Sequence, residues 1–215
     1  MSQRYWPFFD LVVRTPRLEL RPIDDELAVA LAPMATRDIF PDGRSQFQLD
    51  WLYLPSPEKE RSSLQYWWRN RAELSPAHWK LDLAVLVDGQ PAGVQDLSAD
   101  RFPLRRSVVT ASWLARGFQG RGLGIEMRQA VLHLAFDGLE ALEAHSAAFV
   151  SNERSIAVSR SVGYEENGRE LSLRAGNEPE TIVRFRMTAE GFSSSRRDDI
   201  ELESLEPCLA VLGLR

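Results

Sequence analysis

The sequence is poor in the residues that build disulfides and most metal sites. Its 215 residues include one cysteine, Cys208, and three histidines. A single cysteine excludes a disulfide within the chain and a cysteine-based zinc site, and we expect no bound metal. No apolar run reaches the length that crosses a bilayer. The first residues lack a signal-peptide layout, since Pro7 and Asp10 interrupt a short apolar run. We therefore expect a cytoplasmic protein without a membrane partner.

The charge balance excludes another class of partner. Lysine and arginine number 26 against 31 acidic residues, which gives a net charge of −5 and a pI near 5.4. Such a chain is a poor non-specific binder of nucleic acid. With 44% hydrophobic and 27% charged residues, the composition is that of an ordered protein with one sizeable core.

Two common phosphate-binding motifs are missing, yet the chain has a glycine cluster. The Walker pattern requires Gly-Lys-Ser/Thr, and the dinucleotide pattern GxGxxG fails at its third glycine. Gly117, Gly120, Gly122 and Gly124 nevertheless lead directly into a helical pattern. A glycine-rich turn before a helix presents free backbone N–H groups at a positive dipole end, which suits an anion such as phosphate. A glycine-rich turn before an ordinary helix is the alternative.

The helix that follows the glycines is predicted to be amphipathic and to end at Gly138. Its apolar residues recur at helical spacing, and they are Met127, Ala130, Val131, Leu134 and Ala135. The residues expected on its solvent side are Glu126, Arg128, Gln129, His133 and Asp137.

The other elements are expected from periodicity, turn residues and helix caps. The first half is expected to hold a strand at 11–24, a helix from Asp24 to about 35, an aromatic connection at 37–56 that includes Phe47, and a helix that runs to about 74, with Ser56 as its N-cap and Pro57 as its first residue. A hairpin at 81–98 that turns at Asp88-Gly89, a polar connection at 99–106 and a strand at 107–115 then lead to the glycine loop and its helix. The last elements are a strand at 141–150, a short helix at 152–164, and strands at 164–174 and 180–188. The tail at 196–215 is too apolar for free coil. We expect it to pack on the body or on a second subunit, which leaves a homo-oligomer open.

Several segments resemble one family. The hexapeptide Gln119 to Gly124 matches the Q/R-x-x-G-x-G/A motif of the GNAT superfamily of acyl-CoA-dependent N-acyltransferases. Four further segments resemble its ribosomal-protein N-acetyltransferase branch, and they are Thr15–Pro22, Ser112–Leu114, Asn152–Val158 and Val162–Tyr164. The resemblance spans residues 14 to about 190. The aromatic N-terminus and Gly93–Ser98 look closest to actinobacterial members, some of which are described as succinyl-CoA transferases.

The resemblance implies a fold, a division of the chain and a co-substrate. The fold would be α+β, with a mixed and mostly antiparallel sheet, helices on both faces and a splayed acyl-CoA cleft. Residues 1–195 would form the N-acyltransferase domain, and residues 196–215 a C-terminal extension. Acetyl-CoA or succinyl-CoA would be the co-substrate. Its contacts would come from the strand end, the loop and the short helix, at Trp113, Leu114, Ala115, Gln119, Gly120, Arg121, Gly122, Leu123, Gly124, Ile125, Asn152 and Ser155.

The catalytic groups are less constrained by the sequence. Many family members place a tyrosine acid five residues before the aromatic of the G-F/Y pair, and that position here is Ser159. A small residue that only leaves room for the thiol is the alternative. Asp96 is one candidate base, with Glu143 and His145 as others. A base acting through water, or no base at all for an α-amine, also fits. A succinyl carboxylate would need a cationic partner, for which Arg101, Arg105 and Arg106 are candidates, or else they form a solvated turn.

The implied activity is direct transfer of an acetyl or succinyl group from the thioester to an amine. The acceptor would be a protein N-terminus, a lysine or a small molecule. A non-catalytic acyl-CoA sensor with the same fold is the main alternative, and an α/β protein without a CoA site is the third.

Overall fold

The computed structural model describes residues 5–35, 39–40 and 50–214. The strands are β1 Val12–Arg14, β2 Glu19–Pro22, β3 His78–Val87, β4 Gln90–Asp100, β5 Ser107–Leu114, β6 Glu143–Phe149, β7 Glu165–Arg174, β8 Glu178–Thr188 and β9 Glu201–Glu203. The α-helices are α1 Asp25–Leu31, α2 Glu58–Ala72, α3 Phe102–Arg105, α4 Leu123–His133, α5 Glu153–Ser161, α6 Ala189–Ser193 and α7 Glu206–Val211. Short 3-10 helices cover Pro7–Asp10, Ala32–Met34, Asp50–Tyr53 and Arg116–Phe118, and a π-helical turn, Leu134–Gly138, extends α4. None of the described helices is long and apolar enough to span a bilayer.

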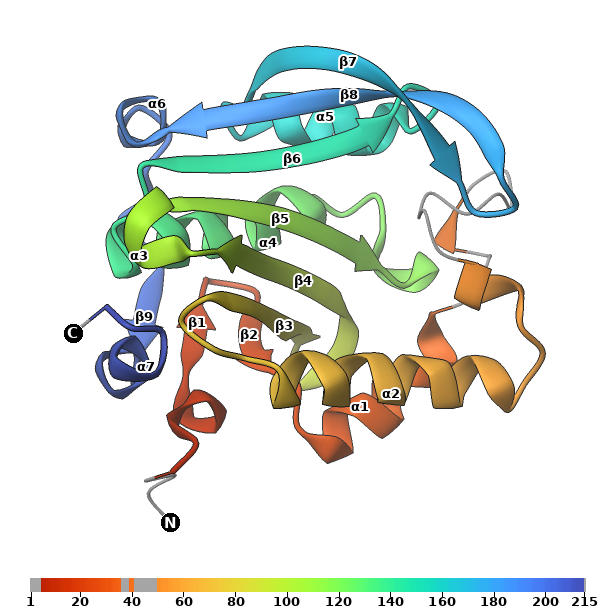
Figure 1. The fold of residues 1–215 in the computed structure, drawn as a ribbon, viewed down its shortest axis with the longest axis horizontal. Helices are drawn as coiled ribbons and strands as arrows, with labels where there is room; N and C mark the ends of the chain where they lie inside the picture. The colour runs from red at the N-terminus through yellow and green to blue at the C-terminus, as the bar shows by residue number, and fades with distance from the viewer. Residues whose placement is uncertain (1–4, 36–38, 41–49, 215) are drawn as a thin grey trace.

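All nine strands join one sheet in the order β7-β8-β6-β5-β4-β3-β2-β1-β9 (Figure 1). Every neighbouring pair is antiparallel except β5 and β6, which run parallel. The predicted mixed, mostly antiparallel sheet is therefore confirmed. The hairpin prediction is confirmed too, because Asp88 and Gly89 both take the positive φ angles of a two-residue turn.

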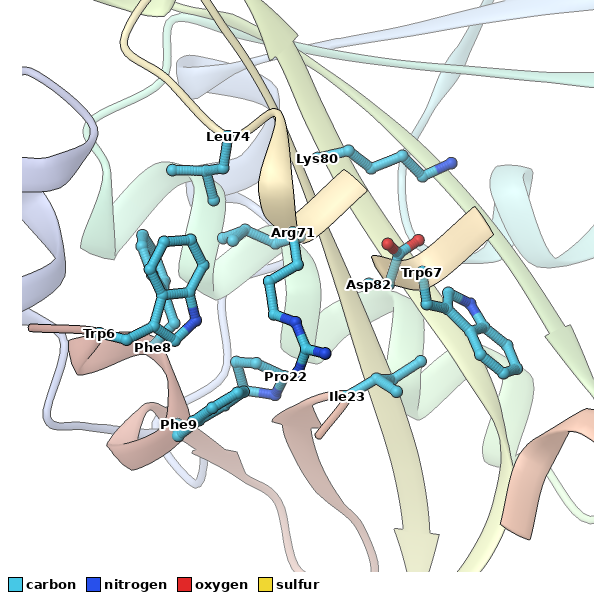
Figure 2. Close-up of a pocket in the computed structure, with 11 residues that line it drawn as sticks. Trp6, Phe8, Phe9, Pro22, Ile23, Trp67, Arg71, Leu74, Lys80 and Asp82 are labelled. Carbon is cyan, nitrogen blue, oxygen red and sulfur yellow. The ribbon is translucent and has the colours of Figure 1, made fainter. Parts of the chain in front are cut away.

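Alternating residues of β3 serve two separate cores, as a strand buried on both faces requires. Ala84 and Leu86 face α1 and α2, where they pack with Ile23 and Trp67. Figure 2 shows Trp67 from α2 lying close to Ile23 on this side of the sheet.

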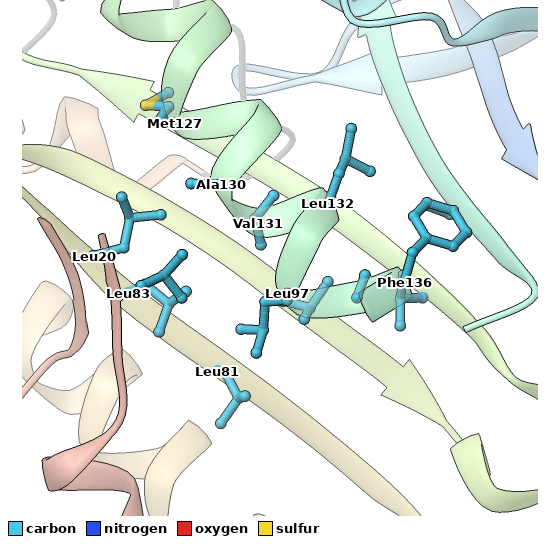
Figure 3. Close-up of a cluster of buried hydrophobic side chains, with 14 of the residues drawn as sticks. Leu20, Leu81, Leu83, Leu97, Met127, Ala130, Val131, Leu132 and Phe136 are labelled. Atoms are coloured by element: carbon cyan, nitrogen blue, oxygen red, sulfur yellow. The ribbon is translucent and has the colours of Figure 1, made fainter. Parts of the chain in front are cut away.

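The opposite face of the sheet carries the larger core. Leu81 and Leu83 of β3 and Leu97 of β4 pack there against the apolar side of α4, which includes Met127 and Val131 (Figure 3). The sheet therefore has helices on both faces, and the predicted apolar stripe of α4 is confirmed.

The structure corrects three of the predicted elements. The single strand expected at 11–24 is two strands, because Thr15 accepts the Leu18 N–H at its hydroxyl and turns the chain at Pro16. Helix α2 begins at Glu58 after Pro57 and ends at Ala72, whereas we predicted a start at Pro57 and an end near residue 74. The connection at 99–106 contains α3. Most of the aromatic connection, including Phe47, lies outside the described residues.

The predicted solvent side of α4 is wrong for three residues. Glu126, Arg128 and His133 are all buried, with at most 3% of each residue exposed. The β1–β2 turn covers Glu126, and Arg197 of the tail donates its backbone N–H to His133 Nε2 at 3.0 Å. Burial lowers the pKa of His133, which fits an imidazole that accepts at Nε2. Segments remote in sequence thus cover the side that periodicity assigns to solvent.

The tail is part of the folded body. Strand β9 pairs with β1 through Leu202 and Val13, and α7 buries Cys208 and Leu209 in the larger core. These contacts lie within the chain itself. The division into units at residue 195 stays a prediction.

Replacing Gly93 by alanine tests how closely β4 and β5 must approach. A Cβ at Gly93 would lie 2.2 Å from the Trp113 carbonyl oxygen and 2.9 Å from Leu114 Cα, and neither backbone atom can move without separating the strands. We expect Gly93→Ala to lower the free energy of unfolding by about 3 kcal/mol or more, measured by urea denaturation. Gly117→Ala is the matched control, because nothing lies within 4 Å of its Cβ. Equal stability of both variants would contradict this packing.

Candidate active site

A gap opens between the parallel strands β5 and β6. They pair at Ser107↔Glu143, Val108↔Ala144 and Val109↔His145, and no further pair follows. At the end of the paired region, the Ser146 hydroxyl donates to the Thr110 carbonyl oxygen at 3.3 Å. Beyond it, β6 continues along β8 while β5 continues along β4. The last residues of β5 therefore keep one backbone edge toward the gap.

The direction of the β5 backbone groups decides which of them a ligand in the gap can meet. The Ala115 N–H donates to the Ala92 carbonyl at 2.8 Å, toward β4. Because N–H groups alternate along a strand, those of Ser112 and Leu114 point toward the gap and that of Trp113 toward β4. Of the expected backbone donors Trp113 to Ala115, the structure therefore places only Leu114 at the gap, and Ser112 was missed.

The glycine loop follows β5 directly and ends at the N-terminus of α4. Gly120 and Gly122 have φ angles of 74° and 77°, a left-handed conformation that favours glycine. Gly122 is the N-cap of α4, and no described side chain caps it. The first-turn N–H groups at Leu123 and Gly124 are thus of the kind that binds anions at a helix start. A Cβ at Gly124 would lie 3.7 Å from Val158 of α5, so this glycine also allows α4 and α5 to approach.

Gln119 holds the loop against the end of β5. Its amide nitrogen donates to the carbonyl oxygens of Leu114 and Ile39, each at 2.8 Å, and its oxygen accepts from Arg154 at 3.0 Å. The side chain thus connects the loop to three other segments. Arg121 and Ile125 flank the α4 start, and Arg121 is exposed.

A buried carboxylate fastens the same helix start to the β1–β2 turn. Glu126 accepts from the Thr15 hydroxyl at 2.6 Å, the Arg17 backbone at 3.1 Å and Arg17 Nε at 2.6 Å. Burial acts to raise the pKa of Glu126, but these hydrogen bonds outweigh it and lower the pKa. Arg17 Nη1 also donates to the Arg121 carbonyl at 2.9 Å. The β1–β2 turn therefore fixes the position of the glycine loop and of the first turn of α4.

Helix α5 lies beside the loop and presents the other predicted residues. Asn152 caps it by accepting the Ser155 N–H at 3.2 Å. Contact with a ligand stays a prediction for Asn152 and Ser155. Ser159 is 0% exposed, and its hydroxyl has no hydrogen-bond partner among the described residues. A ligand would reach this hydroxyl only if the surrounding side chains moved.

A pocket of about 560 Å³ lies on the α2 face of the sheet, beside the end of β5. Its walls are largely aromatic and its floor carries charge. The lining residues are Trp51, Leu54, Ser62, Ser63, Gln65, Tyr66, Trp67, Arg69, Lys80, Val94, Asp96, Ala111, Ser112 and Trp113. The side chain of Trp113 thus faces this pocket.

Two aspartates lie opposite each other on the α2 face of the sheet, and Asp96 also lines the pocket. Asp82 of β3 and Asp96 of β4 are cross-strand partners. Each has one buried carboxylate oxygen, Oδ1, with no hydrogen-bond partner among the described residues. A proton shared between the two carboxyls satisfies both oxygens. Asn70 donates to the other Asp82 oxygen at 2.8 Å. Burial first, and then the Asp96 charge, raise the pKa of Asp82 well above its usual value, so Asp82 holds the proton.

Lys80 completes this group. Its ammonium lies 2.9 Å from Asp96 Oδ2 and also donates to the Tyr66 hydroxyl. Burial acts to lower the pKa of Lys80, but the Asp96 charge outweighs it and raises the pKa. Figure 2 shows Lys80 and Asp82 projecting from the same side of β3. Next to the pocket, this group thus combines a neutral carboxyl, a carboxylate and an ammonium, and the last two line the pocket.

Comparison with known proteins identifies the family. A family model described as an acetyltransferase (GNAT) domain matches residues 17–165, which is more than half of the chain. This chain belongs to the GNAT acetyltransferase family. The predicted GNAT fold, with β5 and β6 parted above a glycine loop, is therefore confirmed.

Individual relatives agree with this assignment. YdaF of Bacillus subtilis (strain 168), provisionally named a ribosomal N-acetyltransferase, is 29% identical over 104 residues, which are 48% of this chain and 54% of YdaF. Among solved structures, Mycobacterium smegmatis RimJ in complex with a CoA disulfide has a TM-score of 0.72 at 19% identity, covering 95% of each chain. RimL, a ribosomal L7/L12 α-N-protein acetyltransferase in complex with coenzyme A, has 0.69 at 20% identity, covering 82% of this chain and 97% of RimL. At these identities the structures establish the fold. The succinyl donor stays a prediction.

Several candidates of the sequence analysis lie away from the gap of this GNAT protein. Glu143 and His145 are on the paired part of β6, where Glu143 binds Arg186 and His145. The three arginines considered for a succinyl carboxylate precede β5, an eight-residue strand that spans roughly 25 Å, whereas the loop follows it. They are Arg101, Arg105 and Arg106.

Asp82 and Lys80 were missed because their meeting with Asp96 depends on strand register. No group of three His, Cys, Asp or Glu side chains is placed to hold a metal ion within the described ranges.

Because Asp82 is protonated in the folded protein, we expect the stability difference between Asp82→Asn and wild type to depend on pH. Folded Asp82 keeps a proton that the unfolded chain loses above a pH of about 3.9, so the free energy of unfolding falls as pH rises from about 4 to the raised pKa. Asp82→Asn abolishes this titration and still donates to Asp96. We expect its stability relative to wild type to rise by about 1.4 kcal/mol per pH unit in that window, measured by urea denaturation. Asp88→Asn in the exposed turn is the control. A difference independent of pH would contradict a protonated Asp82.

Proposed function

We propose that this protein is an N-acetyltransferase that moves the acetyl group of acetyl-CoA to the α-amine of a protein N-terminus. The observation that carries the proposal is the arrangement of two sites about the gap. The glycine loop and the α4 start lie at one end of it, and the pocket with Asp96 adjoins β5.

In this arrangement the loop holds the pyrophosphate of coenzyme A. Backbone N–H groups from Arg121 to Gly124 are the donors, because the Ile125 N–H already donates to the Gly122 carbonyl at 3.2 Å, and the helix dipole favours the negative charge. Pantetheine then runs through the gap, where the Leu114 N–H polarises the thioester carbonyl as charge develops on its oxygen. Asn152 and Ser155 extend this contact from α5.

Asp96 is the base that we assign to the amine. The attacking nitrogen must be neutral, and an α-amine with a pKa near ~8 loses its proton more readily than a lysine near ~10.4. Because Lys80 binds Asp96 Oδ2 and the buried Oδ1 faces the proton held by Asp82, the amine proton reaches Asp96 Oδ2 through a water. The aromatic pocket, with Tyr66, Trp67 and Trp113 in its walls, suits the first residues of an extended chain.

The printed descriptions of the relatives support this acceptor. RimL is described as acting on the α-amine of ribosomal L7/L12, and the name of YdaF also points to a ribosomal protein. A ribosomal protein N-terminus is therefore the acceptor to test first. The donor that we propose is acetyl-CoA, because the arginines considered for a succinyl carboxylate lie at the other end of β5.

A CoA-release assay tests this function. Acetyl-CoA and succinyl-CoA are supplied in parallel with N-terminal peptides of ribosomal proteins, lysine peptides blocked at the α-amine, and small amines. We expect turnover with acetyl-CoA and α-amines. Asp96→Asn should lower kcat about 100-fold or more, as expected for loss of a general base, whereas Asp100→Asn, an exposed residue of the same strand, should leave it unchanged.

Two further variants separate binding from chemistry. Gly122→Glu should abolish CoA binding, because its φ of 77° disfavours any side chain and its carboxylate repels phosphate. Ser159→Ala should reduce kcat less than 10-fold if the buried hydroxyl is not the acid. Tight CoA binding without turnover on any amine would contradict the proposal and indicate a sensor.

A further inference from the structure

Arg128 places a positive charge inside the protein where β5 and β6 begin to part. The residue comes from α4 and is 3% exposed. Its Nη2 donates to the Ser112 hydroxyl of β5 at 3.0 Å, and its Nη1 donates to the Ser146 hydroxyl of β6 at 3.1 Å. The guanidinium therefore joins the two strands just beyond their last paired residues, Val109 and His145.

This charge is poorly compensated. No carboxylate among the described residues forms an ion pair with Arg128, and its Nε has no hydrogen-bond partner there. The groups that face it are the hydroxyls of Ser112 and Ser146 and the phenol of Tyr164, its one titratable neighbour. Burial lowers the pKa of Arg128 and raises that of Tyr164. Arg128 is a cation because a guanidinium is not deprotonated in proteins, and the phenol of Tyr164 is neutral. A buried cation that meets only neutral dipoles is costly unless an anion arrives.

Ser112 connects this charge to the gap. Its oxygen accepts from Arg128 on the α4 face of the sheet, and its backbone lies on the separated part of β5, next to the gap. Within the described residues its hydroxyl hydrogen has no acceptor. Ser146, in contrast, passes its hydrogen to the Thr110 carbonyl. Ser112 can therefore donate to a ligand in the gap, and Arg128 makes it a stronger donor.

We infer that Ser112 and Arg128 form a thiolate site for the sulfur of coenzyme A, in which Ser112 donates to the sulfur and Arg128 is the positioning residue behind it. The inference rests on the proposed function. In the reaction, the amine nitrogen forms a bond to the acyl carbon and the carbon–sulfur bond breaks. The electron pair of the broken bond stays on sulfur, and the amine proton passes to Asp96. Coenzyme A thus leaves as a thiolate, which later takes a proton from water.

This site accounts for the state of Ser159. Many family members carry a tyrosine acid at that position, but Ser159 is fully buried. A leaving group stabilised as a thiolate needs no proton from it. The buried cation of Arg128 takes over the role of the acid by lowering the energy of the anion itself.

Titration of the thiol of bound CoA tests the site without any acceptor. The thiolate absorbs in the ultraviolet, so a pH series of the binary complex gives the thiol pKa directly. We expect this pKa to lie at least one unit below that of free CoA, measured alongside. Arg128→Met should return it to the free value, and Ser112→Ala should remove much of the shift. Arg160→Met, at an exposed position of α5 paired with Glu166, should change nothing.

The outcomes separate this inference from the proposed function. Acetyl transfer with an unshifted thiol pKa would overturn the thiolate site and leave the function standing. A lowered thiol pKa without turnover on any amine would support the thiolate site and overturn the proposed function. Failure of CoA to bind would overturn both. If Arg128→Met fails to fold, Ser112→Ala still decides, because it keeps the buried cation and removes only the donor. A thiol pKa equal to that of wild type in Ser112→Ala would count against the site.

Discussion

Strands β5 and β6 pair over three residues and then part, and the rest of the molecule depends on that separation. Each strand remains satisfied on its outer edge, β5 by β4 and β6 by β8, so the gap costs backbone hydrogen bonds on one edge only. It frees the Leu114 N–H, opens a path to the α2-side pocket, and lets the glycine loop begin where β5 ends. If β5 and β6 paired throughout, there would be no path for pantetheine, and an anion site at the glycine loop would not be connected to the pocket.

Charged side chains lie on both faces of the sheet near this gap, and they differ in how far neighbouring charges compensate them. Glu126 is fully partnered by Thr15 and Arg17 and fixes the helix start. Asp96 is balanced by Lys80 on one side and by a protonated Asp82 on the other. Arg128 is buried and forms no ion pair with a carboxylate among the described residues. A base on one side of β5 and an unbalanced cation on the other match a reaction that takes a proton from nitrogen and places charge on sulfur.

Local patterns predicted much of this, and long-range contacts explain what they missed. Asp88-Gly89 and the glycine cluster are turn chemistry within a few residues, so the hairpin and the loop before α4 could be predicted. Periodicity places Glu126, Arg128 and His133 on the solvent side of the helix. This expectation is wrong because the segments that cover them lie far away in the chain. Asp82 is subtler. A bulge between Val85 and Leu86 shifts the register by one residue, which places Asp82 opposite Asp96 instead of Gln95. Pro91 and Gly93 flank the extra residue, Ala92, and both residue types often mark a bulge, but they do not show by themselves that Asp82 meets Asp96.

A crystal structure of the complex with coenzyme A tests the central claim most directly. The account predicts density for the pyrophosphate against the backbone N–H groups of residues 121–124. It also predicts pantetheine between the separated ends of β5 and β6, with the Leu114 N–H bonded to it. Coenzyme A bound elsewhere, or strands β5 and β6 closed into continuous pairing in the complex, would contradict the account.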